Sequence, residues 1–282
     1  MQFRCRCSAL GNITVGISFS PLGLTEKQSL RLAELQYKGS KSQELKDLIE
    51  KRDTIIEPTL STGAKTYIQD VWYSEHFEFQ KSFTNKFTEK GKIQESRSIK
   101  DLIGYFNSIS EKKIFASKNE QWLQNDWIHG TPDLRLNTPR CTIDTKNVYY
   151  PNGLSFFDSE KEKRNYIDQI HGYNWLDGKD VGFVARILMN PPDSILEKEV
   201  WNYWKDAGKD GQPTDSFRDE VRELFNFERK PIDERVNLFR VATTENDIKV
   251  IKKAVELSNE YWKVLNEQFS NRNTAIEFFK NR

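Results

Sequence analysis

Two neighbouring segments of the chain, residues 127–136 and 141–149, carry the pattern of β-strands. Both are rich in β-branched and aromatic residues, and the residues between them, Asn137 to Arg140, have the composition of a tight turn. The sequence therefore predicts a β-hairpin. With its turn centred on Thr138 and Pro139, antiparallel pairing places Asp133 opposite Asp144.

The two-residue period of a strand separates the side chains of the second segment onto two faces. Asp144 and Lys146 share one face, and Ile143 and Thr145 point to the other. With Asp133 opposite Asp144, one face of the hairpin is expected to carry two acids and a lysine.

Apolar positions at helical spacing predict helices elsewhere, over the segments 25–38, 43–52, 61–79, 91–106, 160–176 and 244–268. Thr25 begins the first of these with a capping box that includes Gln28. Two continuous apolar segments, 181–189 and 235–243, predict buried central strands of a mixed sheet.

The helix over 91–106 places Glu95 on the same face as its apolar stripe. Buried carboxylates are rare unless they are paired or bind a metal, so this spacing favours Glu95 as a third acid that reaches Asp133 and Asp144. A glutamate at the end of the stripe, or one paired with a nearby lysine, is the structural alternative. Gly91, one turn earlier, would let a neighbouring backbone come close.

The composition is that of a soluble globular protein with a sizeable core, since 37% of its 282 residues are hydrophobic and 12% are aromatic. The formal net charge of +1 means that attraction to nucleic acid must come from a local patch. We see no internal repeat or flexible linker and predict a single α/β domain over 1–282, with a central mixed β-sheet flanked by helices and a helical N-terminal part. Within it we expect a catalytic core at about 84–189 and 235–270 and a polar, aromatic insertion at about 190–231.

The three cysteines make neither an even disulfide framework nor a four-thiolate cluster site. No apolar run reaches the length of a membrane span, and no apolar signal-peptide segment follows Met1 to Arg4. We therefore expect a reduced, cytoplasmic protein that does not enter a membrane.

The facing acids Asp133 and Asp144 point to a divalent cation, because like charges opposite one another destabilise a sheet unless a cation lies between them. Magnesium accepts one or two carboxylates and keeps waters that can become nucleophiles. Lys146 would lie beside such a water, where its ammonium would stabilise a phosphate anion or, with a lowered pKa, help to activate the water. A surface hairpin with solvated Asp144 and Lys146 is the alternative that these residues alone leave open.

The ordered set of motifs resembles the PD-(D/E)xK nuclease superfamily. Pro132-Asp133 followed by Asp144-Thr145-Lys146 is similar to its signature, and Gln169 to Tyr173 is similar to the QxxxY motif of its RecB-type and lambda-exonuclease-like branches. Gly91 to Glu95 resembles the GxxxE element of the phage exonucleases in that group. The resemblance covers residues 91–173 and implies a restriction-endonuclease-like core.

This resemblance implies roles for individual residues. The implied ligands of one or two Mg²⁺ ions, which Mn²⁺ would replace, are Asp133, Asp144, Glu95 and the main-chain carbonyl of Thr145. Lys146 would assist the attacking water, and Gln169 would orient that lysine or the substrate phosphate. The predicted contacts to DNA are Tyr173, Thr131, Arg6 and Ser8.

The resemblance also implies a Mg²⁺-dependent exonuclease that digests linear duplex DNA, 5′ to 3′, in phage-type recombination or DNA processing, in the host cytoplasm if a phage encodes it. The implied partners are duplex DNA ends, a single-strand annealing recombinase and further copies of the chain in a homotrimer. Polarity, processivity and oligomeric state do not follow from the residues themselves. An endonuclease or a single-strand nuclease would use the same site. A non-cleaving module that binds DNA ends, and a hydrolase of another phosphate ester, are alternatives of other classes.

Overall fold

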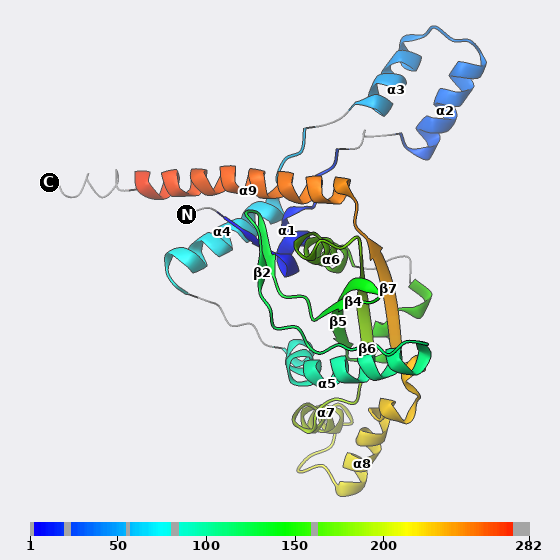
Figure 1. Cartoon of the computed structure of the whole chain (residues 1–282), viewed down its shortest axis with the longest axis vertical. Coiled ribbons are helices and arrows are strands. Elements are labelled where there is room, and N and C mark those ends of the chain that lie inside the picture. The colour runs from blue at the N-terminus through cyan, green and yellow to red at the C-terminus, as the bar shows by residue number, and fades with distance from the viewer. Residues whose placement is uncertain (1–2, 20–23, 55–56, 80–84, 159–162, 273–282) are drawn as a thin grey trace, which may run out of the picture. The chain divides into compact units, whose positions relative to one another are not determined.

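The computed structural model describes residues 3–19, 24–54, 57–79, 85–158 and 163–272. The chain divides into two compact units, which are described separately. One consists mainly of Asn12–Asp70 and the segment from Lys249 onward, and the other of Phe3–Gly11 and Val71–Ile248. Figure 1 labels the elements along the chain. The single domain over 1–282 stays a prediction.

The first unit is built from helices. α2 (Glu26–Tyr37) and α3 (Gln43–Asp53) contact each other, and the capping box predicted at Thr25 is present. Three further helices have residues in both units: α1 (Leu10–Ile13), α4 (Thr62–His76) and α9 (Glu245–Asn271). The predicted helices of this part of the chain are thus confirmed, within a few residues at their ends.

The second unit contains a four-stranded sheet in the order β4-β5-β6-β7. Its strands are β4 (Leu134–Asn137), β5 (Arg140–Val148), β6 (Val181–Leu188) and β7 (Val236–Ala242). β5 pairs antiparallel with β4 and parallel with β6, and β7 pairs antiparallel with β6. The sheet is therefore mixed, as predicted.

The hairpin of β4 and β5 has the predicted register. Leu134 pairs with Ile143 and Leu136 pairs with Cys141, as a turn centred on Thr138 and Pro139 requires. Continued by one residue, this register brings Asp133, just before β4, towards Asp144.

The prediction of one strand over 127–136 is wrong, because this segment contributes to two sheets. β3 (Ile128–Gly130) pairs with β1 (Cys5–Arg6) and β2 (Leu123–Gln124) in a separate three-stranded sheet. The chain leaves the ladder between β3 and β4, where Pro132 has no N–H to donate.

The prediction that 235–243 forms a buried central strand is also wrong. β7 lies at the edge of its sheet, and 36% of Leu238 is exposed. β6, between β5 and β7, is a buried interior strand as predicted, and β5 is the other interior strand of the sheet.

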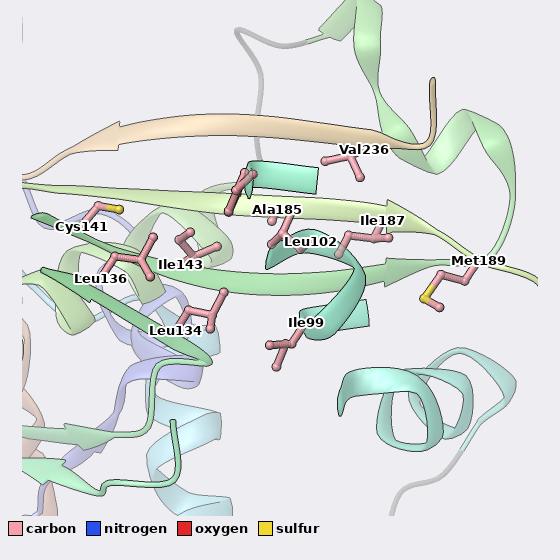
Figure 2. Close-up of a cluster of buried hydrophobic side chains, with 11 residues drawn as sticks. Ile99, Leu102, Leu134, Leu136, Cys141, Ile143, Ala185, Ile187, Met189 and Val236 are labelled. Atoms are coloured by element: carbon pink, nitrogen blue, oxygen red, sulfur yellow. The ribbon is translucent and has the colours of Figure 1, made fainter. Parts of the chain in front are cut away.

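Helices α5 (Lys86–Ile109) and α6 (Arg164–Asp177) cover opposite faces of the four-stranded sheet. Ile99 and Leu102 of α5 pack into one apolar cluster with Ile143 (Figure 2). The neighbouring Thr142 points to the other face, where its side chain hydrogen-bonds Asn174 of α6. The predicted start of this helix near residue 160 lies outside the described residues.

The close approach of α6 to β6 depends on Gly182. A Cβ at this position would lie 2.6 Å from Ile170 Cγ2 and 2.6 Å from Thr142 Oγ1. A larger residue would therefore push α6 away from the strands that it covers.

The segment predicted as an insertion forms α7 (Asp193–Asp206) and α8 (Asp215–Leu224). Their apolar residues, with Val200 and Val221 among them, form a small core with Tyr149, which follows β5. Short 3₁₀ turns complete the chain at Cys7–Ala9, Pro151–Leu154, Phe156–Asp158, Phe227–Arg229 and Ile232–Glu234. No helix within the described ranges has both the length and the apolar character to cross a membrane.

Candidate active site

A pocket of about 380 Å³, called the acidic pocket below, brings five of the predicted site residues together. They are Glu95, Asp133, Asp144, Thr145 and Lys146. Helix α5, the residue before β4 and the strand β5 supply them. The pocket is also lined by Phe87, Thr88, Gly91, Lys92, Asn147 and Tyr166.

The carboxylate of Asp133 is fixed by the next strand. Its Oδ2 accepts hydrogen bonds from the main-chain N–H and from the hydroxyl of Thr145, both at 2.6 Å. Because Asp133 lies outside the β4 ladder, these two bonds hold its side chain against β5.

Asp144, Lys146 and Gln169 form a connected group. Lys146 Nζ lies 2.5 Å from Asp144 Oδ2 and donates a hydrogen bond of 3.1 Å to Gln169 Oε1. Gln169 Nε2 donates to Asp144 Oδ1, also at 3.1 Å. The glutamine of α6 thus holds the lysine and the acid of β5 together, as expected for a residue that orients Lys146.

Burial raises the pKa of Asp144 to about 6, with contributions from the nearby acids Asp133 and Glu95 and opposition from Lys146. Burial opposes the charge on Lys146, but the Asp144 carboxylate outweighs it and raises the pKa of this lysine. Of the two predicted roles for Lys146, stabilisation of a phosphate anion fits this pKa. Activation of water by Lys146 stays a prediction.

Protein groups already compensate the two facing acids, so their repulsion does not by itself require an ion. Lys146 pairs with Asp144, and Thr145 donates two hydrogen bonds to Asp133. The expectation that two facing acids need a cation between them is therefore not met here, because Lys146 and Thr145 take that place.

The acidic pocket nevertheless fits a hard divalent ion. Asp144 is buried, its Oδ2 has Lys146 as an ion-pair partner, and a second carboxylate, that of Asp133, lines the same pocket. Within the described ranges no three His, Cys, Asp or Glu side chains are close enough together to hold a metal. Two carboxylates are the donor set with which Mg²⁺ is commonly bound, the remaining positions being taken by water and substrate oxygens.

Glu95 lines the acidic pocket, but it is not buried on the apolar stripe as predicted. Its side chain is 35% exposed and lies 3.5 Å from Lys118 Nζ, while Gln94 is the buried neighbour. The predicted alternative of a lysine partner is therefore present as well. Gly91 does not serve a close backbone approach, since a Cβ there would meet no atom within 4 Å.

The four predicted DNA contacts do not line the acidic pocket as far as the chain is described. Tyr173 is only 5% exposed and accepts a hydrogen bond from Gln169 Nε2 at 2.9 Å, so little of its ring is open to a base. Arg6 and Ser8 are exposed, and Thr131 is half-buried. Contact with DNA stays a prediction for all four.

The sequence did not predict five of the residues that line the acidic pocket, namely Phe87, Thr88, Lys92, Asn147 and Tyr166. Tyr166 lies beneath Lys146, whose Nζ is 4.7 Å from the ring centre, and Phe87 comes from the first turn of α5. Asn147 follows Lys146 and has a buried Oδ1 without a hydrogen-bond partner among the described residues. Only Tyr166 had a sequence signal, since it precedes Gln169 by about one helical turn.

The fold matches solved exonuclease structures over nearly the whole chain. A phage related exonuclease from Haemophilus somnus 129PT matches with a TM-score of 0.63 and 20% identity, covering 95% of this chain and 97% of that chain. The alkaline exonuclease LHK-Exo from Laribacter hongkongensis matches with a TM-score of 0.55 and 9% identity, covering 97% of this chain and 94% of that chain. The sequence itself matches no family model and no curated protein. The predicted resemblance to exonucleases is thereby confirmed for the fold.

Proposed function

We propose that this protein is a metal-dependent exonuclease that hydrolyses phosphodiester bonds of linear duplex DNA. One observation carries the proposal: Asp133 and Asp144 share a pocket with Lys146, which is ion-paired to Asp144 and held by Gln169. The same constellation is the one that the motifs predict, and the fold is shared with exonucleases.

Each residue then has a defined task. Asp133 and Asp144 would hold a Mg²⁺ or Mn²⁺ ion, with the Thr145 carbonyl as a further proposed ligand and Glu95 as one that would first have to leave Lys118. When bound, such an ion polarises the phosphate and lowers the pKa of a water. Lys146 offers its ammonium to the negative charge that develops on the phosphate.

The finer parts of the proposal rest only on the family resemblance. They are 5′-to-3′ polarity, a role in phage-type recombination beside a single-strand annealing recombinase, and assembly as a homotrimer. An endonuclease with the same site is the second candidate, because two carboxylates and a lysine do not determine where on a strand the cut falls.

Digestion of a linear duplex beside a closed circular duplex of the same sequence tests the proposal. We expect loss of the linear form alone in Mg²⁺, none in EDTA, and release of a 5′-terminal label as mononucleotide. Nicking of the circle would favour the endonuclease. Absence of cleavage of either form, with binding intact, would favour the non-cleaving module.

A further inference from the structure

Glu95 and Lys118 form an ion pair at the edge of the acidic pocket. Glu95 Oε2 lies 3.5 Å from Lys118 Nζ, and each side chain is 35% exposed. Glu95 belongs to α5, whereas Lys118 belongs to the segment 110–122 between α5 and β2. Glu95 lines the acidic pocket, and Lys118 is not among the described residues that line it. The pair thus ties a carboxylate of the candidate active site to a lysine outside it.

Lys118 lines a different pocket of about 490 Å³, called the polar pocket below. Of the described residues that line it, Lys118 and Arg135 are cationic and Glu120 is acidic. Arg135 is already engaged, because its Nε donates to Asp177 at 2.8 Å. Lys118 is therefore the cation of this pocket that has a choice of partners: Glu95, or an anion such as a phosphate that enters from solvent.

The main chain that carries Lys118 is fixed beside Asp133. Asn119 N donates to Asp133 O at 2.7 Å, and Asn119 Nδ2 donates to Pro132 O at 2.9 Å. On the preceding side, Ile114 packs against the apolar cluster that α5 shares with the sheet. The segment that brings Lys118 to the acidic pocket is thus bound to the same residues that bring Asp133 there, and the position of the lysine is built into the fold.

Glu95 is the carboxylate that leaves the metal site incomplete. Glu95, Asp133 and Asp144 all line the acidic pocket, but within the described ranges no three His, Cys, Asp or Glu side chains are close enough together to hold a metal. Asp133 and Asp144 are held by residues of β5, namely Thr145 and Lys146. Glu95 differs from them because its partner lies outside the pocket. Its side chain has three rotatable bonds, so a change of rotamer can redirect the carboxylate.

We propose that Lys118 is a positioning residue that holds Glu95 away from the metal site until a DNA phosphate binds the lysine at the polar pocket. Once released, Glu95 is free to join Asp133 and Asp144 as the third carboxylate of that site. Metal and DNA then favour each other's binding, because each removes one partner from the same ion pair. The inference rests on the proposed function and adds to it a coupling between substrate and metal.

The expected effects are modest, because the pair is partly exposed. Measured exposed ion pairs correspond to about a two- to fivefold change in an equilibrium constant. Lys118 and Glu95 are both half-buried surface residues, so their substitution is not expected to disturb the core.

Binding of Mn²⁺ in the absence of DNA, followed by the electron paramagnetic resonance signal of the free ion, tests the hold on Glu95. Lys118→Met is expected to lower the Kd for Mn²⁺ about two- to fivefold. In a Glu95→Gln background this gain should vanish, because the carboxylate that Lys118 holds is gone. An unchanged Kd in Lys118→Met, or a gain that persists in Glu95→Gln, would overturn the proposal.

Lys92→Met is the matched control for the general effect of a removed positive charge. Lys92 is exposed and lines the acidic pocket, but among the described residues it forms no ion pair with Glu95. Any change that Lys92→Met causes in the Kd for Mn²⁺ should therefore be the same with Glu95 and with Glu95→Gln. A change that disappears in Glu95→Gln, as for Lys118→Met, would show that no specific pair is involved and would contradict the assignment.

Binding of a labelled linear duplex in EDTA tests the other half of the exchange. Lys118→Met is expected to reduce the slope of log K against log salt by about 1, with Lys112→Met as the exposed control outside the acidic and polar pockets. Glu95→Gln should tighten binding about two- to fivefold, because it no longer competes with the phosphate for Lys118, and this gain should be absent in Lys118→Met. An unchanged slope, or an equal gain in both backgrounds, would overturn the exchange.

The outcomes separate this inference from the proposed function. A wild type and variants that show both exchange effects but cleave no DNA in Mg²⁺ would overturn the exonuclease and keep the coupling. Cleavage of linear DNA by the wild type, with the same Kd for Mn²⁺ in Lys118→Met, would do the reverse. Absence of Mn²⁺ binding in the wild type and in every variant would overturn both.

Discussion

The acidic pocket shares a wall with an adjoining pocket of about 390 Å³, called the cationic pocket below, but the two differ in the charges that line them. In the first, Asp133, just before β4, and Asp144 of β5 converge, and protein donors hold them in place. In the second, the cations Lys163 and Arg186 stand among aromatic rings. Lys146 belongs to both. The difference separates a site that suits a metal ion from one that suits an anion, and the predictions below test that separation.

The largest effect is expected for Lys146→Ala, which removes the cation common to both pockets. Cleavage should fall by about 10³-fold or more, because the charge that stabilises the transition state is lost. Binding of DNA in EDTA should remain, since Lys163 and Arg186 are unchanged. Retained cleavage, measured beside the exposed control Lys112→Ala, would remove Lys146 from the chemistry.

A smaller loss is expected for Gln169→Leu, which acts through the residues that it positions. Gln169 bonds to both Asp144 and Lys146, and loss of such a support commonly costs about 10–100-fold. The loss should appear in kcat and leave KM nearly unchanged. A change in KM alone would instead place Gln169 at the DNA.

The side of the cationic pocket that Tyr149 lines should depend on Glu199 of α7. Glu199→Gln weakens the contacts to Lys86 and Tyr149 in a buried place, and we expect a loss of about 1–3 kcal/mol in the free energy of unfolding, measured in urea. The matched control is Glu197→Gln on the same helix, because the Glu197 side chain is 40% exposed and pairs with the half-buried Arg218, and the expected loss is below about 1 kcal/mol. Equal losses would show that Glu199 does not tie α7 to this side of the pocket.

The smallest effect is a change of stability with pH that arises at Lys90, behind the same pocket. Burial lowers the pKa of Lys90 to about 8, although Glu228 opposes this. Between pH 8 and the pKa of about 10.4 of an unfolded lysine, the unfolded chain therefore binds more protons, and stability rises with pH. The stability advantage of the wild type over Lys90→Met should grow across this window. An advantage that stays flat or shrinks would contradict the lowered pKa.

The hairpin and its acids could be predicted because two local rules agree there. The turn at Thr138 and Pro139 sets the register, and the two-residue period then places Asp144 on the face opposite to Ile143. The break between β3 and β4 was predictable in principle from Pro132, but the β-rich composition on both sides concealed it.

The face of α5 could not be predicted from apolar spacing alone. Lys90, Gln94 and Ser98 are buried there at intervals of four residues, next to Ile99 and Leu102. Hydrogen bonds compensate most of their polar atoms: Lys90 Nζ donates to the carbonyls of Val148 and Met189, and Gln94 Nε2 donates to Asn190 O, although Gln94 Oε1 has no hydrogen-bond partner among the described residues. The spacing of apolar residues gives no signal for buried polar residues. The buried position was therefore predicted for Glu95, whereas its neighbour Gln94 occupies it.

The cationic pocket could not be predicted from the sequence, for a different reason. Its walls come from segments that are far apart in the sequence, including Phe87, Tyr150, Lys163 and Arg186. No local period links these positions, and each residue alone is common on protein surfaces. Only the fold brings them beside the acids.

The most direct test of the account compares Asp144→Asn with wild type on one labelled linear duplex, with cleavage measured in Mg²⁺ and the Kd in EDTA. Asp180→Asn, an exposed acid outside both pockets, is the control. We predict that Asp144→Asn loses cleavage by about 10³-fold while its Kd stays within a few-fold of wild type. Cleavage at the wild-type rate would contradict the claim that the acidic pocket cuts DNA.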